Sequence, residues 1–330
     1  MRPLVLITVV ATLEGCGSFE NENIVLDTRV LAMVADVPDQ IIDVDLSMPV
    51  DPVALLEQLR PSTVCALVAD PSFDRQLRYS LTLCALNSAD RCRSPETVLA
   101  QGLLDDPDIT IEPDPQAPAP ALCATIMPDG NLLGVVLKVL DGDVFQGLGG
   151  IDYGLSLQVG GDGVDPELDL FAAKRLRVSP RIPPGLSENH NPPVTPFTAA
   201  KDGVDPQPLP MGRCVDQTAP LELVPTQRVR ILPVEPDGAR ETYVVPTIDG
   251  MEQTFTESLT YQWMAGAGGF SSGSTGGPRD FSGNPAPLFS DYRAPKAVDL
   301  DGPTDIPIWI VQRDERLGAR WYETCVRVRP

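Results

Sequence analysis

The chain has 330 residues, 42% of them apolar, and its 46 acidic residues against 25 basic ones give a formal net charge of −21. This charge argues against nucleic acid as a partner, because such binding depends on lysines and arginines that displace counterions from phosphates. The length fits two domains of about 100 to 200 residues each. The 35 prolines and 27 glycines disfavour long helices. We therefore expect a mainly β protein of two domains.

The first residues have the layout of an export signal. Arg2 precedes an apolar run of about ten residues, Leu4 to Leu13, and the small Gly15 stands directly before Cys16. The run is well short of the ~20 residues that a permanent membrane-spanning helix needs. The sequence therefore predicts a cleaved signal.

Leu13-Glu14-Gly15-Cys16 resembles the bacterial lipobox, with Glu14 where that motif usually has a small residue. The resemblance implies a signal peptide of residues 1–15, cleavage before Cys16, and attachment of fatty acid such as palmitate to that cysteine. Gly17 is not the aspartate that retains lipoproteins at the inner membrane, so the outer membrane is the expected location. Residues 16–27 are polar, as a tether would be. The alternative is an ordinary secreted protein with Cys16 as a spare or paired thiol.

Six cysteines remain if Cys16 carries lipid, and an even number suits a disulfide framework in an oxidising compartment. None of them has the C-x-x-C spacing of a structural zinc site. Four lie in the first half and two in the second, so pairing within each half is the simplest scheme. It joins Cys214 to Cys325 and, by proximity, Cys84 to Cys92 and Cys65 to Cys123.

Residues 28–180 are predicted to form the first domain. Leu77, Tyr79, Leu81 and Leu83 alternate with more polar neighbours, which is the period of a half-buried strand. Further short strands are expected at 29–37, 64–69, 153–159 and 170–178. Residues 132–140 are apolar on all sides, so both a helix capped by Asn131 and a strand remain open, and we favour the helix.

Residues 181–210 are predicted to be a linker, because 179–196 holds six prolines and few groups suited to a sheet. The second domain is then 211–330. Its strands are expected around 229–231, 259–264, 308–311 and 322–328, with a loop at 266–277 and a turn at Gly318. Trp263 should point inward, as the tryptophan on the third strand of an immunoglobulin-like sandwich does.

Four segments carry a likeness to a known group of proteins. They are Arg29 to Asp36, Ala66 to Pro71, Asn189 to Pro193, and Trp309 to Trp321. They resemble uncharacterised surface lipoproteins of Gram-negative bacteria with tandem immunoglobulin-like domains. The resemblance implies two immunoglobulin-like β-sandwiches in tandem, with one short helix in the first, and lends no catalytic residue.

One serine and one histidine are candidates for catalysis. Gly269 to Gly273 matches G-x-S-x-G, in which Ser271 would be the nucleophile of an α/β hydrolase. His190, the single histidine, precedes Ser271, whereas that fold places its histidine last. A chance match in a glycine-rich loop is the better interpretation. One histidine also falls short of most catalytic zinc sites, and no lysine with serine or threonine completes a phosphate loop.

Several acidic turns allow a calcium or paired-carboxylate interpretation. They contain Asp141 and Asp143, Asp162 and Asp165, and Asp299, Asp301 and Asp305. None has the twelve-residue spacing of an EF-hand, and Asp-Gly is common in ordinary turns. Turns are the favoured interpretation, with calcium as a minor alternative.

The sequence thus predicts a lipid-anchored envelope protein with a non-catalytic binding or scaffolding role, whose partner is an envelope protein or a glycan. The long loop at 266–287 and the hairpin at 313–320 are candidate contact surfaces, since sandwiches present loops at their ends. The alternative is an envelope hydrolase that acts on glycan or peptide through carboxylates the sequence does not locate.

Overall fold

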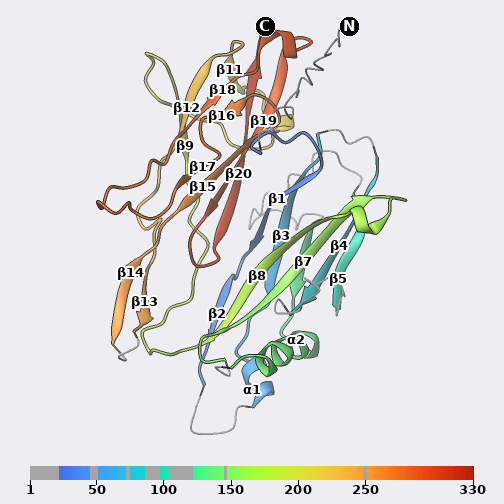
Figure 1. The fold of residues 1–330 in the computed structure, drawn as a ribbon, viewed down its shortest axis with the longest axis vertical. Helices are drawn as coiled ribbons and strands as arrows, with labels where there is room; N and C mark the ends of the chain where they lie inside the picture. Colours follow the sequence, from blue (N-terminus) through green and yellow to red (C-terminus); the bar gives the residue numbers. More distant parts are fainter. Residues whose placement is uncertain are drawn as a thin grey trace, which may run out of the picture.

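The computed structural model describes residues 22–44, 51–71, 75–85, 97–104, 122–144, 147–247 and 251–330. As expected, the protein is mainly β, and its strands form two β-sandwiches (Figure 1). No helix in these ranges is long and apolar enough to cross a membrane.

The first sandwich packs a three-stranded sheet against a five-stranded one. The smaller sheet has the order β1 (Arg29–Ala35), β3 (Ser62–Ala69), β6 (Cys123–Ile126). The larger has the order β2 (Asp39–Ile42), β8 (Leu170–Pro180), β7 (Ile151–Gly161), β4 (Leu77–Cys84), β5 (Thr97–Leu104). Leu77, Leu81 and Leu83 of β4 are fully buried between them. The strand predicted at these residues is therefore confirmed, although its alternation is partial, because Thr82 and Cys84 are buried as well.

The second sandwich packs two five-stranded sheets face to face. One has the order β10 (Gln207–Pro208), β9 (Phe197–Lys201), β12 (Arg228–Pro233), β18 (Ser290–Arg293), β16 (Gly269–Phe270). The other has the order β11 (Leu221–Leu223), β20 (Ala319–Val328), β19 (Thr304–Arg313), β15 (Thr260–Ala265), β17 (Ser274–Gly276). A separate hairpin, β13 (Thr242–Pro246) with β14 (Glu252–Thr256), extends from this sandwich.

Both sandwiches follow one plan, which is immunoglobulin-like. In each, an early strand runs parallel to the last strand, β2 beside β8 and β11 beside β20, while the remaining pairs are antiparallel. Trp263 on β15 is fully buried and packs edge-on against Phe197 at a centroid distance of 6.2 Å. The inward tryptophan predicted for the second domain is therefore confirmed.

Two helices lie at one end of the first sandwich (Figure 1). The helix predicted near 132–140 is α2 (Gly130–Asp141), but its cap is Asp129 rather than Asn131. The Asp129 carboxylate accepts hydrogen bonds from the Asn131 N–H at 2.9 Å and the Leu132 N–H at 3.2 Å. The short α1 (Pro52–Leu56), capped by Asp51, was not expected.

Two segments expected to lie outside the domains, the linker and the tether, contribute residues to the second sandwich. β9 and β10 belong to it although they lie inside the expected linker 181–210. The tether predicted at 16–27 also ends earlier, because Asn23 and Val25 pair with Ala265 through hydrogen bonds of 2.9 Å. Val25 is fully buried. The polar composition of these segments concealed single apolar residues that pack on the second sandwich.

The expected loop 266–277 contains the strands β16 and β17. Gly276 has φ +79, and a Cβ there would lie 2.3 Å from the Leu259 carbonyl oxygen. Glycine at this position allows two strands to approach closely. The many glycines of the segment therefore wrongly indicated a loop.

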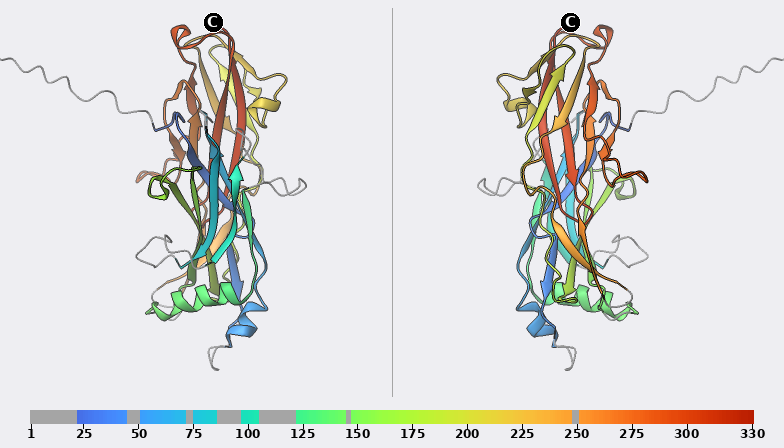
Figure 2. Two further views of the ribbon diagram at one scale, coloured as in Figure 1. Left: turned by 90° about the vertical axis from the view of Figure 1, so that its right-hand side faces the viewer. Right: turned by 90° about the vertical axis from the view of Figure 1, so that its left-hand side faces the viewer.

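The two sandwiches lie side by side, as Figures 1 and 2 show. The outer face of the β1–β3–β6 sheet packs on the outer face of β15, β19 and β20 in a third apolar core. Leu31 and Leu67 meet Trp309 and Trp321 there, all 5% exposed or less. β1 and β3 are therefore buried on both faces.

The proline-rich segment 181–196 lies in this junction rather than spanning a gap. The Asn191 amide donates to the Ala35 carbonyl at 2.6 Å and accepts from the Ala319 N–H at 3.0 Å. The Asn189 amide donates to the Arg316 carbonyl at 2.7 Å. Because one asparagine bonds to both sandwiches, this segment fixes their relative position.

Candidate functional site

Two of the predicted disulfides are present. Cys65–Cys123 joins neighbouring positions of β3 and β6, and Cys214–Cys325 joins the short 3-10 turn Cys214–Asp216 to β20. Cys84 is disulfide-bonded as well. Cys92 and the lipidation candidate Cys16 lie outside the described residues, so the Cys84 to Cys92 pairing and the lipid on Cys16 stay predictions.

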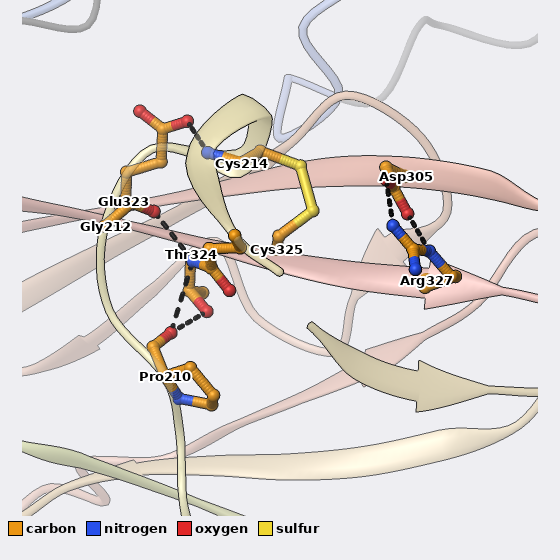
Figure 3. Close-up of a disulfide and its surroundings, with 9 residues drawn as sticks. Pro210, Gly212, Cys214, Asp305, Glu323, Thr324, Cys325 and Arg327 are labelled. Carbon is orange, nitrogen blue, oxygen red and sulfur yellow. Dashed lines mark hydrogen bonds and ion pairs between the residues drawn. A yellow bond between two sulfur atoms is a disulfide. The ribbon is translucent and has the colours of Figure 1, made fainter. Parts of the chain in front are cut away.

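The second disulfide holds a segment against the outside of the last strand (Figure 3). The Cys214 N–H donates to a Glu323 carboxylate oxygen at 2.8 Å, and the Gly212 N–H donates to the Glu323 carbonyl at 2.7 Å. Thr324 donates its hydroxyl to the Pro210 carbonyl at 2.5 Å. Cys325 is fully buried by this cover.

The structure does not bring the candidate catalytic pair together. His190 is exposed and its Nδ1 lies 2.9 Å from Glu241 Oε1. The Ser271 hydroxyl accepts from the Asp291 N–H at 3.0 Å and lies 3.4 Å from the Ser290 hydroxyl. Ser271 directly follows the two-residue strand β16, and the next element is the strand β17. In a hydrolase the nucleophile lies on a turn between a strand and a helix.

Three acids of the acidic turns bond to other groups of the chain. Asp143 accepts from the Gly147 N–H at 2.7 Å, and Asp165 caps the short turn Pro166–Leu168. Asp305 is held by both arms of Arg327 at 2.6 and 2.7 Å, which lowers the pKa of Asp305. Within the described ranges, no three His, Cys, Asp or Glu side chains form a group that could hold a metal ion.

The hairpin at 313–320, expected as a contact surface, instead turns into the junction. The Arg316 side chain is 13% exposed and lies 3.7 Å from Glu241, 3.7 Å from Glu257 and 3.9 Å from Asp39. We call Asp39, Glu241, Glu257, Asp314 and Arg316 the Arg316 cluster. Burial raises the pKa of Glu257 to about 7, and it also raises the pKa values of Asp39 and Asp314.

The other expected contact surface does project into solvent. Residues 278–285, here called the Phe281 loop, are all exposed, and the side chain of Phe281 at the tip is fully exposed. The loop connects β17 of one sheet to β18 of the other. A fully exposed phenylalanine is uncommon, because aromatic side chains gain most from burial.

The loop is ordered from tip to base by its own hydrogen bonds. One Asp280 carboxylate oxygen accepts from the N–H groups of Ser282 and Asn284 at 2.8 Å each, and the other accepts from the Asn284 amide at 2.9 Å. These bonds lower the pKa of Asp280, so it stays ionised and keeps accepting. At the base, the Gly276 N–H donates to the Pro287 carbonyl at 2.8 Å. Phe281 is therefore presented on a preformed loop.

An exposed aromatic tip is hard to predict from the residues of this loop. Phe281 stands alone among glycine, serine, proline and asparagine, and no periodicity distinguishes an exposed aromatic residue from a buried one there. The D-x-S-G-N pattern from Asp280 was the available signal, since aspartate and asparagine stabilise tight turns through their side chains.

The chain matches no protein-family model and no curated protein. Among solved structures it is similar to the native conformation of E. coli alpha-2-macroglobulin, at 11% identity and a TM-score of 0.20, over 94% of this chain and 17% of that one. The chain thus spans less than a fifth of that protein's length.

Proposed function

We propose that this protein is a lipid-anchored component of the bacterial cell envelope with a non-catalytic binding role, and that the Phe281 loop contacts a protein partner. The observation that carries the binding role is the fully exposed Phe281 on a loop ordered by Asp280. An aromatic side chain that enters a partner's pocket is a common centre of binding energy.

The order of the loop favours recognition over incidental exposure. A loop that is already fixed loses little conformational freedom when it binds, so more of the contact energy appears as affinity. Phe281 also has few rotatable bonds, which keeps its own ordering cost low. A protein pocket is the partner chemistry that suits one apolar ring surrounded by polar loop residues.

The anchor part of the proposal rests on the lipobox-like sequence before Cys16. Asn23 to Val25 already pair with β15, and the chain from Cys16 to Glu22 reaches at most about 20 Å. A lipid on Cys16 would therefore hold the second sandwich near the membrane surface. We expect radioactive fatty acid to label the protein, and Cys16→Ala to abolish both label and membrane retention. A Cys16→Ala protein that stays equally membrane-bound would refute the anchor.

The Phe281 loop is tested by recovering partners from envelope extracts with wild type, Phe281→Ala and the control Val298→Ala. Val298 is an exposed apolar residue on a short turn elsewhere in the same sandwich. We expect Phe281→Ala to lose the specific partner by about tenfold or more, and Val298→Ala to recover it fully. Asp280→Ala should weaken recovery less, because the ring remains but the loop loses its order. Equal recovery by wild type and Phe281→Ala would rule out the loop as the contact.

The envelope hydrolase remains the alternative function, and Glu257 is the acid whose pKa of about 7 best suits general acid–base chemistry. Glu257 is only 3% exposed and faces Arg316 in the junction. An acid that substrate does not reach is better explained as part of the junction.

A further inference from the structure

An open cleft of about 610 Å³ lies on the second sandwich, bounded by β12, β16 and β18 and by the first described residues of the chain. Its walls include the basic side chains of Arg228, Arg293 and Lys296, all exposed. The strands β12, β16 and β18 lie close together in Figure 1. The volume is within the range of about 300 to 1,000 Å³ that small-molecule sites have.

Two neighbouring cross-strand pairs of β12 and β18 differ in charge. β12 and β18 are antiparallel, and Arg230 stands opposite Asp291 while Arg228 stands opposite Arg293. Arg230 and Asp291 form a two-armed ion pair with distances of 2.8 and 3.2 Å. Two like charges directly opposite each other on paired strands repel, so the second pair is unfavourable unless something compensates for it.

No described residue compensates for the arginine pair. Over the part of the chain that the structure describes, Arg228, Arg293 and Lys296 make no side-chain ion pair, although acids outnumber bases by 46 to 25 in the sequence. Other arginines do have acidic partners, among them Arg78, Arg181 and Arg327. The acids that line the cleft are already engaged: Asp291 by Arg230, and Asp299 by the Lys296 N–H at 3.3 Å.

The remaining walls suit a ligand with both a charged and an apolar part. Ile24, Leu26 and Phe270 also line the cleft. One wall is main chain from Gly266 to Gly269, and a Cβ at Gly268 would lie 2.5 Å from the Arg293 carbonyl. Glycine at 268 therefore lets this main-chain wall pack directly against β18, the strand that carries Arg293.

We infer that this cleft binds a phosphate group between Arg228, Arg293 and Lys296. Guanidinium groups bind phosphate through two parallel N–H donors each, and lysine adds a point charge. A phosphate would remove the repulsion between the two arginines. The phosphate of a lipid headgroup and a free phosphate ester share this chemistry. The lipid source rests on the proposed anchor, since Ile24 is eight residues after Cys16, but the site itself does not.

The test uses the whole chain after residue 16, with wild type and Arg228→Gln/Arg293→Gln compared in two arms. In the first arm, calorimetry measures the binding of inorganic phosphate and of glycerol 3-phosphate. In the other, the protein is sedimented with phosphatidylcholine vesicles that either contain or lack phosphatidylglycerol. We expect each lost arginine contact to weaken binding by about tenfold or more. Binding in solution alone indicates a soluble phosphate ester, and preferential binding to phosphatidylglycerol vesicles indicates the lipid; either supports the site.

Two further variants separate the site from general charge and from folding. Arg327→Gln/Arg329→Gln removes the same charge from arginines that already have acidic partners, Asp305 and Glu222, and should bind as wild type does. Arg293→Asp would place an acid opposite Arg228, as Asp291 stands opposite Arg230 in the neighbouring pair. This variant should have a melting temperature no lower than that of wild type and should still lose phosphate binding. Absence of phosphate binding by wild type in both arms, or an equal loss in the Arg327 control, would overturn the inference.

Discussion

The junction between the two sandwiches has one apolar region and one polar region, and the two do different work. In the apolar region, Leu31 and Leu67 of the first sandwich pack on Trp309 and Trp321 of the second. In the polar region, Arg316 of the second sandwich meets Asp39 of the first together with Glu241 and Glu257. The apolar contact supplies stability, whereas the buried charges make the junction sensitive to pH.

The tryptophans show that burial dominates the apolar region. Among the described residues, neither Trp309 nor Trp321 has a hydrogen-bond partner for its indole N–H, although both are 5% exposed or less. An unmet buried donor costs about 1 to 3 kcal/mol. The free energy gained by removing the two indole rings from water must therefore exceed the cost of their two unmet N–H groups.

The largest effect is expected from Trp321→Ala. It removes a large buried side chain between the sandwiches and should lower the free energy of unfolding by about 3 to 5 kcal/mol. Trp321→Phe keeps most of the ring area and removes the unmet N–H, so it should cost much less. Urea unfolding measures both. Equal losses for alanine and phenylalanine would mean that packing of the ring is not what holds the junction.

Arg316→Met tests the polar region and should cost about 3 kcal/mol. The change leaves Glu257 and Asp39 buried without their cation, and breaking a buried pair costs more than replacing it whole. Arg316→Met with Glu257→Gln should recover part of the loss, because the uncompensated charge is then gone. A double variant that is less stable than the single one would contradict an electrostatic origin.

The pH dependence of stability follows from Glu257. Its pKa is about 7 when folded and 4.5 as a free group, so between these values the folded state binds more protons than the unfolded state. Stability therefore falls as pH rises from about 4.5 to 7, by on the order of 2 kcal/mol from this residue. Asp39 and Asp314 act in the same direction, since their pKa values are also raised.

Glu257→Gln removes this contribution and is compared with wild type by urea unfolding at pH 5 and pH 8. We expect the difference between the two pH values to shrink in the variant. The buried Lys174 has its pKa lowered to about 8, and its contribution rises with pH only above that value. An unchanged pH difference in Glu257→Gln would place the dependence elsewhere.

The sequence predicted what local pattern controls and missed what long-range packing controls. The alternation at Leu77 to Leu83, the helix after Asp129 and the two described disulfides were all accessible from it. The strands β9 and β10 were hidden by the prolines around them, and of the two only β10, at the edge of its sheet, contains a proline itself. β1 and β3 read as plain apolar runs because the junction buries both of their faces, and a one-dimensional pattern does not reveal the partner of the second face.

The candidate sites were less accessible for the same reason. Lipidation of Cys16 could be proposed because the signal is contiguous in sequence. The arginine pair of the cleft depends on the register of β12 and β18, which brings together residues 65 positions apart. A shift of one residue would turn these side chains to the opposite face, so nothing short of the register predicts the pair.

Asn191→Ala is the smallest of the expected effects and the most specific to the segment between the sandwiches. The variant leaves the Ala35 carbonyl and the Ala319 N–H without their amide partner, and both residues are 3% exposed or less. We expect a loss of about 1 kcal/mol in urea unfolding, with Val194→Ala as the control because Val194 is exposed in the same segment. If Asn191 fixes the two sandwiches relative to each other, amide exchange should quicken in both β1 and β20. Faster exchange in one sandwich alone would show that the asparagine supports only that side of the junction.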